Sequence, residues 1–218
     1  IRSNIDTRIS DKITVGLKLF AGRTNSKNID DQGYKGNPVM SSLAWAPTEP
    51  VYSSPGMYNR TAVSPIWSNP YMVAMERDGN VFSNTAALNG KVRYTITDYL
   101  TLDVVLGVNL RIDKLAGITN QWLNPLSQSS SQSMAESYTF QNSDILTFHK
   151  VYNSKHDLTV MGLVESNNNK SYGFNASGSG LMSTSNGYYN LALNSSQSIG
   201  STYSNWALLS YVGRIAYS

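Results

Sequence analysis

The chain has 218 residues, of which only 14% are charged, and its formal net charge is +3. A typical soluble domain carries about 25% charged residues. The absence of cysteine excludes disulfide bridges, Cys-based redox motifs and zinc ribbons, and the scattered lysines and arginines argue against nucleic-acid binding. No run approaches the ~20 apolar residues of a membrane helix. This absence does not exclude a β-barrel, because the apolar and polar residues of an alternating strand average out in a hydropathy window.

Period-two alternation is the dominant pattern along the chain. It predicts seven strands, over residues 1–10, 13–21, 86–96, 100–112, 145–152, 158–165 and 207–217. In the clearest run, every even position from Leu100 to Ile112 is apolar, while Asp103, Asn109 and Arg111 stand at odd positions. Successive side chains of a strand point to opposite faces, so one face of this strand is aliphatic and the other carries charge. Thirteen residues exceed the ~9–11 that a tilted strand needs to cross a bilayer.

The predicted connections alternate between short and long. Residues 11–12, 97–99 and 153–156 have the length and composition of hairpin turns, whereas residues 22–85, 113–140 and 166–205 are long and polar. Short periplasmic turns and long extracellular loops are typical of outer-membrane barrels. The fold class that we predict is all-β, an antiparallel transmembrane β-barrel segment of about seven long strands. A soluble β-sandwich is the competing interpretation.

The first long loop concentrates proline and aromatic residues. Six of the seven prolines lie there, and they lower the entropy of the unbound loop. Its aromatic side chains are predicted to stack on cargo, or alternatively to pack against one another and hold the loop over a pore. The substrate-binding candidates are Trp45, Tyr52, Tyr58, Trp67 and Tyr71, together with Trp122 in the next loop.

Several segments, kept in order along nearly the whole chain, resemble SusC/RagA-type TonB-dependent transporters of the bacterial outer membrane. They are residues 2–6 with 13–16, residues 47–52 with 56–58 and Asn69-Pro70, residues 156–162, and the Ser-Tyr-x-Gly-Arg strand in residues 209–217. The resemblance implies a barrel of about 22 strands around a plug, energy supplied through TonB, a SusD-like lipoprotein partner, and an oligosaccharide or peptide cargo. The whole chain, 1–218, is then expected to be part of one barrel domain, with the plug and remaining strands outside it.

No catalytic constellation stands out in the sequence. It contains no HExxH, P-loop or GxSxG motif, and His149 and His156 flank one predicted turn as interfacial polar residues. We therefore expect no enzyme activity, no cofactor and no metal. Basic residues on the charged strand face, Lys18, Lys91, Arg93 and Arg111, are expected to pair with acids of the plug. A passive porin or adhesin-like barrel is the alternative function, and a barrel lipase a further one.

Overall fold

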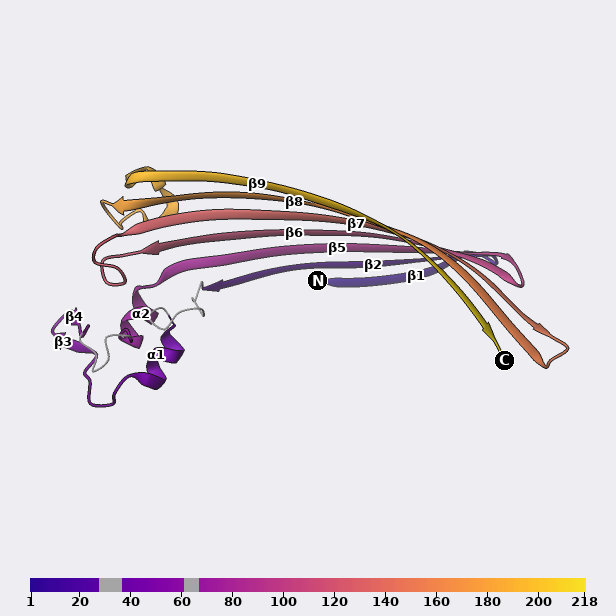
Figure 1. Cartoon of the computed structure of the whole chain (residues 1–218), viewed down its shortest axis with the longest axis horizontal. Helices are drawn as coiled ribbons and strands as arrows, with labels where there is room; N and C mark the ends of the chain where they lie inside the picture. Colours follow the sequence, from indigo (N-terminus) through magenta and orange to yellow (C-terminus); the bar gives the residue numbers. More distant parts are fainter. Residues whose placement is uncertain (28–36, 61–66) are drawn as a thin grey trace.

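The computed structural model describes residues 1–27, 37–60 and 67–218, and one curved antiparallel sheet dominates it (Figure 1). Seven strands follow one another as a meander in the order β1-β2-β5-β6-β7-β8-β9, which confirms the predicted fold class and number of long strands. Their bounds are Arg2–Ser10 (β1), Ile13–Lys27 (β2), Asp78–Thr97 (β5), Leu100–Thr119 (β6), Ser129–Tyr152 (β7), His156–Leu181 (β8) and Asn194–Tyr217 (β9).

Six of the seven strands are longer than the alternation predicted, and β1 alone keeps about its predicted length. β5 and β6 have 20 residues each, and β8 has 26. The predicted loops 113–140 and 166–205 were wrong for most of their length, since β6 and β7 leave only residues 120–128 between them, and β8 and β9 leave residues 182–193. The added strand is rich in Ser, Asn and Gly on both faces, so it has no apolar alternation for a sequence pattern to detect.

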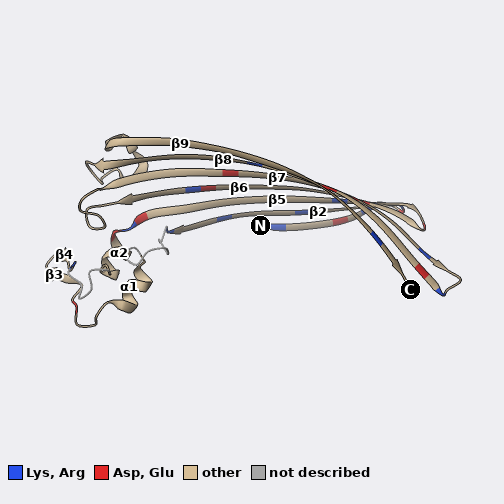
Figure 2. Cartoon of the chain, in the orientation of Figure 1, with Lys and Arg blue, Asp and Glu red and all other residues tan. Residues whose placement is uncertain are grey.

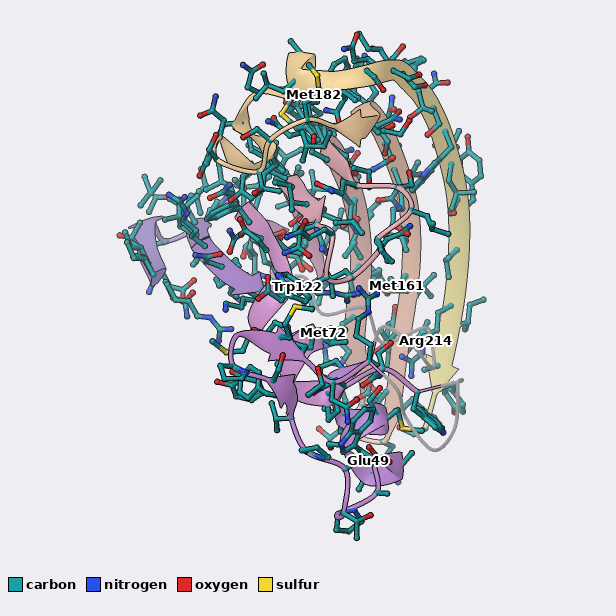
Figure 3. All side chains as sticks on the ribbon, turned by 90° about the vertical axis from the view of Figure 1, so that its left-hand side faces the viewer. Glu49, Met72, Trp122, Met161, Met182 and Arg214 are labelled. Atoms are coloured by element: carbon teal, nitrogen blue, oxygen red, sulfur yellow. The ribbon has the colours of Figure 1, made fainter. Side chains whose placement is uncertain are left out.

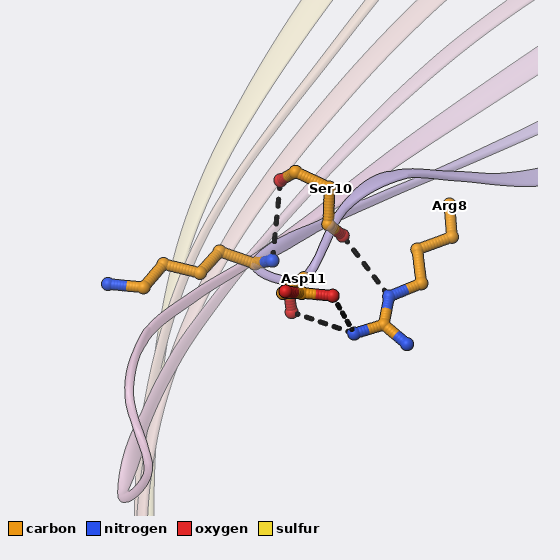
Figure 4. A network of polar contacts seen from close by, with 4 residues as sticks. Arg8, Ser10 and Asp11 are labelled. Carbon is orange, nitrogen blue, oxygen red and sulfur yellow. Dashed lines mark hydrogen bonds and ion pairs between the residues drawn. The ribbon is translucent and has the colours of Figure 1, made fainter.

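The connections are short at one end of the sheet and longer at the other (Figure 1). The three predicted turns are confirmed, and Asn153 and Ser154 both take positive φ values, 52° and 55°, as a type I′ hairpin turn requires. At the first turn, the Arg8 guanidinium donates to the Ser10 carbonyl at 3.2 Å and to the Asp11 carboxylate at 2.8 Å (Figure 4). This end is called the turn end below, and the opposite one the loop end.

The strand register separates the side chains into two faces. Leu17 lies opposite Gly90, Gly90 opposite Leu106, and Val92 opposite Val104, and directly opposed residues share a face. We call this the apolar face, and the face that carries Asp103, Asn109 and Arg111 the polar face. Asp103 is only 8% exposed, and Gly107, Ser143 and Asn169 on the same face are also buried. No described helix covers the middle of the sheet. The burial of these residues therefore indicates that the polar face is the concave face of the curved sheet.

Charged residues are few along the sheet (Figure 2). In the part of the chain that the structure describes, no helix is long and apolar enough to cross a membrane.

Short helices and a small hairpin occupy the connection between β2 and β5. They are α1 (Pro38–Ala44), β3 (Tyr52–Ser54), β4 (Met57–Tyr58) and α2 (Pro70–Glu76). Each helix begins with proline after an asparagine N-cap, Asn37 or Asn69, whose side chain accepts two backbone N–H bonds. The first predicted loop, 22–85, is therefore partly wrong as well, because β2 extends into it from one end and β5 from the other. Residues 28–36 and 61–66, which include Pro65, lie outside the described residues.

Two 3₁₀ turns, η1 (Gly187–Tyr189) and η2 (Leu191–Leu193), lie between β8 and β9. They close over a small apolar core at the loop end, formed by Ile118, Leu181 and Tyr188.

Candidate functional site

Four of the six predicted aromatic candidates meet in one cluster at the loop end. The rings of Tyr52 and Tyr58 stack with centroids 5.3 Å apart, and Tyr71 meets Tyr52 edge-on at 6.1 Å. Trp122, which comes from the connection between β6 and β7, packs edge-on against Tyr58 at 5.1 Å. Figure 3 labels Trp122 together with Met72 and Glu49 of the first connection. The cluster therefore joins two loops that lie far apart in the sequence.

Exposure divides the four rings into two pairs. Tyr52 and Tyr71 are each 45% exposed, whereas Tyr58 and Trp122 are half-buried. All four rings pack against one another, and Tyr52 and Tyr71 also present ring surface to solvent. Stacking on cargo stays a prediction.

Buried asparagines fix the hairpin beneath the cluster. Asn69, 1% exposed, donates to the carbonyls of Val51 and Asn59 at 2.7 and 3.1 Å, and its own oxygen caps α2. Asn59 donates to the Glu49 carboxylate at 2.9 Å. A buried amide with all its hydrogen bonds made specifies one arrangement of the chain around it. Asn69 therefore holds the β3–β4 hairpin against α2 and sets where the tyrosines lie.

Glu76 is the polar link between the two loops. One carboxylate oxygen accepts from the Tyr58 hydroxyl at 2.8 Å, and the other accepts from the Asn120 amide at 2.8 Å. The Asn120 oxygen in turn accepts from the backbone N–H groups of Trp122 and Leu123. Desolvation by burial, with the hydrogen bond to Glu76, raises the pKa of Tyr58 to about 12. Tyr58 thus stays a neutral donor across the physiological range.

Trp45 and Trp67 are the two remaining aromatic candidates of the first connection. The Trp45 indole N–H donates to the Glu49 carbonyl at 3.2 Å and closes the turn after α1. Trp67 is half-buried and lies just before α2. Beside them, α1 leaves Val39, Met40 and Leu43 exposed. The loop layer consequently offers an apolar surface as well as aromatic edges.

The basic residues of the polar face meet acids within the sheet itself. Arg93 binds Asp103 through two hydrogen bonds of 2.7 and 2.8 Å, and Lys91 Nζ lies 3.4 Å from the same carboxylate. Arg111 Nε lies 2.8 Å from Asp113. Three of the four residues expected to pair with plug acids have partners on the wall, and their pairing with a plug stays a prediction. The reason for the wall pairing is cross-strand geometry, which brings Arg93 directly opposite Asp103.

Aromatic side chains form two belts on the apolar face. Tyr138, Tyr172 and Tyr203 make the loop-side belt, with successive ring centroids 6.2 and 5.0 Å apart. Tyr94, Phe148, Tyr152 and Tyr217 make the turn-side belt. Ten residues separate Tyr138 from Phe148, or about 33 Å at ~3.3 Å per residue. At a tilt of 35–45° this is about 23–27 Å, close to the ~25 Å apolar band between the aromatic girdles of outer-membrane barrels.

The turn end carries the two histidines. His149 Nε2 lies 3.0 Å from an Asp157 carboxylate oxygen, and His156 Nδ1 lies 2.6 Å from the Tyr217 hydroxyl. Nearby, the Lys150 ammonium lies 4.3 Å from the Tyr99 ring centroid and 4.9 Å from that of Tyr152. Among residues 1–27, 37–60 and 67–218, no group of three or more His, Cys, Asp or Glu side chains is arranged to hold a metal ion.

Sequence reasoning missed the polar residues that assemble the cluster, namely Asn59, Asn69, Glu76 and Asn120. Asn-Pro at 37–38 and at 69–70 is a helix-start signal, with asparagine at the N-cap and proline at N1, and it would have located both short helices. No local signal links Glu76 to Asn120, because their contact depends on the pairing of β5 with β6.

No family model matches the chain. It is 27% identical over 112 residues, 49% of the chain, to TonB-dependent receptor P3 of Formosa agariphila, and 25% identical over its whole length to TonB-dependent receptor P26 of the same organism. Three solved structures of RagAB, a peptide transporter or importer by name, superpose with TM-scores of 0.77, 0.78 and 0.79 at 18–20% identity, over 99–100% of the chain.

The predicted resemblance to SusC/RagA-type transporters is confirmed. The structural likeness establishes the fold, and the sequence likeness is to proteins named TonB-dependent receptors. The chain spans 11% and 22% of the length of these two curated relatives and 25% of each RagAB chain. In this SusC/RagA-like sheet, the aromatic cluster lies at the end where the long connections are.

Proposed function

We propose that the chain forms part of the wall and mouth of an outer-membrane transporter, one that imports oligosaccharide or peptide nutrients in a TonB-dependent manner with a SusD-like surface lipoprotein. The observation that carries this proposal is a combination of two features. The aromatic belts of the apolar face are separated by about the thickness of the apolar band of a membrane, and an ordered aromatic layer lies at the loop end. The named relatives support the transporter class, and the belt spacing supports a position in a bilayer.

The wall assignment follows from the two faces. On an outer-membrane barrel the apolar face contacts lipid and the polar face lines the interior. Leu17, Leu106 and Val108 are 40–46% exposed on the apolar face, and burial of such side chains in lipid stabilises the barrel. The Arg93–Asp103 pair of the polar face then lies toward the lumen, where a plug would contact it.

The mouth assignment follows from the division within the aromatic cluster. Tyr58, Trp122 and Glu76 hold the two loops together, so that the rings of Tyr52 and Tyr71 are presented in fixed positions. Rings fixed in this way bind a flat sugar or peptide surface without a further ordering cost, at about 0.5–1.5 kcal/mol per aromatic contact. The exposed apolar residues of α1, Val39 and Leu43 among them, suit contact with a protein partner instead.

The test compares variants in the complete transporter, assayed for outer-membrane assembly, cargo uptake and co-purification of the lipoprotein. Deletion of residues 47–58 should leave assembly intact and abolish uptake and partner binding. Tyr52→Ala with Tyr71→Ala should lower uptake several-fold while the partner still co-purifies. Tyr189→Ala is the matched control, because Tyr189 is an exposed tyrosine of the β8–β9 connection. Wild-type uptake and partner binding after the deletion would refute this role for the loop.

A further inference from the structure

Three basic residues gather on the apolar face at the loop end of β2 and β6. They are Arg23 and Lys27 of β2 and Lys114 of β6, and all three are exposed. Phe82 of β5 lies between the two strands, directly opposite Lys114, and the Arg23 guanidinium carbon is 5.5 Å from the centre of its ring. The three basic residues are called the basic cluster below.

The register places the basic cluster on the same face as the aliphatic side chains. Arg23 and Lys27 stand at odd positions of β2, as Leu17 does, and Lys114 stands at an even position of β6, as Leu106 does. Alternate residues of a strand share a face. The other basic residues of β2, β5 and β6 lie on the polar face, namely Lys18, Lys91, Arg93 and Arg111.

The basic cluster begins where the aliphatic side chains end. On the apolar face, Arg23 is the next residue of β2 after Ala21, and Lys114 is the next residue of β6 after Ile112. From these residues to the turn end, β2, β5 and β6 are described throughout and carry no charged residue on this face. Long basic side chains place their methylene stems along apolar surface while the charge reaches a polar boundary. The basic cluster therefore marks the loop-side edge of the apolar surface.

Positive charge is in excess at this edge. Among the described residues, Arg23 and Lys114 form no ion pair with a carboxylate. The acids of the apolar face at the loop end are Asp78, at the start of β5, and Glu136 of β7, which accepts a hydrogen bond of 2.8 Å from the Tyr138 hydroxyl. On the polar face, by contrast, three of the four basic residues just named have a carboxylate partner.

We propose that the basic cluster binds the phosphate groups of a phosphorylated lipid in the outer leaflet of the outer membrane. This inference rests on the proposed outer-membrane location, with the loop end outside the cell. Basic side chains at a membrane surface attract anionic lipid headgroups. The acyl chains of the same lipid then lie along the aliphatic side chains of β2, β5 and β6, so one molecule contacts both parts of the face.

The spread of the basic cluster suits a headgroup with separate phosphates. Arg23 and Lys27 are four residues apart on β2, or about 13 Å at ~3.3 Å per residue. Lys114 is two strands away, or about 10 Å at ~4.8 Å per strand. The Arg23 guanidinium can bind a phosphate through two hydrogen bonds, whereas each lysine acts as a point charge. A single phosphate ion would engage only part of this area.

The test measures the affinity of the complete transporter, purified in detergent, for lipid A added in its diphosphorylated or its dephosphorylated form. Binding to the folded state raises the unfolding temperature, so a titration read by that temperature reports the affinity. The wild type should bind the diphosphorylated form and be stabilised much less by the dephosphorylated form. Arg23→Gln combined with Lys27→Gln and Lys114→Gln should weaken binding of the diphosphorylated form about 100-fold, since each basic residue contributes about five-fold.

A charge-matched variant provides the control. Lys12→Gln combined with Lys150→Gln and Lys155→Gln also removes three positive charges, but at the turn end, and it should bind diphosphorylated lipid A as the wild type does. Lys114→Gln alone should weaken binding about five-fold, and this single variant provides the measurement if the triple variant does not assemble.

Several results would overturn the proposal. One is wild-type affinity of the basic-cluster variants, and another is equal binding of the two forms of lipid A. Equal stabilisation by inorganic phosphate would indicate a site for a soluble phosphate instead. Loss of the lipoprotein partner from the triple variant, with lipid A binding retained, would indicate a protein contact. Membrane fractionation, read separately, reports whether the outer-membrane location itself holds.

Discussion

Introducing an arginine on one face or the other of the sheet tests the assignment of the two faces most directly. Leu17 of β2 lies on the apolar face between Ile5 and Gly90, and its register row continues through Leu106 to Asn142 of β7, which lies near the middle of the β7 segment between Tyr138 and Phe148. An arginine at the bilayer midplane on a lipid-facing position costs about 2–4 kcal/mol. At ~1.4 kcal/mol per ten-fold change, Leu17→Arg should shift the folding equilibrium roughly 30- to 700-fold toward the unfolded state.

Two further variants compare the cost of an introduced arginine at a second position of the apolar face and at a position of the polar face. Leu106→Arg should cost less than Leu17→Arg, because Leu106 pairs with Asn142, whose amide oxygen can accept a guanidinium hydrogen bond. Asn109→Arg adds the same charge to the polar face, between Ala87 and Thr139, and should be close to neutral.

The assay is denaturant unfolding of the complete barrel in phospholipid vesicles, with heat-modifiable gel mobility as the readout of assembly. The expected order of destabilisation is Leu17→Arg, then Leu106→Arg, then Asn109→Arg. Equal stability of Leu17→Arg and Asn109→Arg, or the reverse order, would refute the assignment of the apolar face to lipid.

Three shorter predictions concern the isolated chain and its loop layer. The 218-residue chain expressed alone should aggregate in water and need detergent, because β1 and β9 are open sheet edges and one face is apolar; a monodisperse, cooperatively melting monomer would contradict this. Raising the pH from about 10 to about 12 should disorder the loop cluster and change Trp122 fluorescence, since the raised pKa of Tyr58 contributes stability that is present below pH 10 and lost as Tyr58 ionises; Glu76→Gln should move that transition to lower pH. Asn69→Ala removes an N-cap worth about 0.5–2 kcal/mol and two hydrogen bonds to carbonyls, so proteolysis should cut the first connection while the strands stay protected.

The sequence predicted the fold where burial constrains the pattern. Residues 100–112 must place every second side chain in an apolar environment, and the resulting alternation located β6 and its turn at Asp98 and Tyr99. Beyond Ile112 that constraint disappears. Residues 129–137 and 166–181 are strands because their backbones pair with neighbours, and their polar side chains leave the pairing invisible to a single-sequence pattern.

The candidate site was predictable in composition and only partly in geometry. Proline and aromatic content pointed to Tyr52, Tyr58 and Tyr71, and these three do meet. The partner of Tyr58 is Trp122, 64 positions away in number, and the contact exists because β5 and β6 bring the two loops to the same end of the sheet.

The long polar strand ends support the ordered loop layer. A tilted strand crosses the bilayer in about 9–11 residues, and β7 has 24, so more than half of its length lies outside an apolar band bounded by Tyr138 and Phe148. Most of the excess is on the loop side, where hydrogen bonds between strands make the wall stiff without any apolar face. The loops start from this stiff rim, which is why Glu76 at the end of α2 and Asn120 just after β6 can meet at 2.8 Å. Cluster geometry is thereby coupled to the register of β5 against β6, and a slip of that register would separate Tyr58 from Trp122 as well as Arg93 from Asp103.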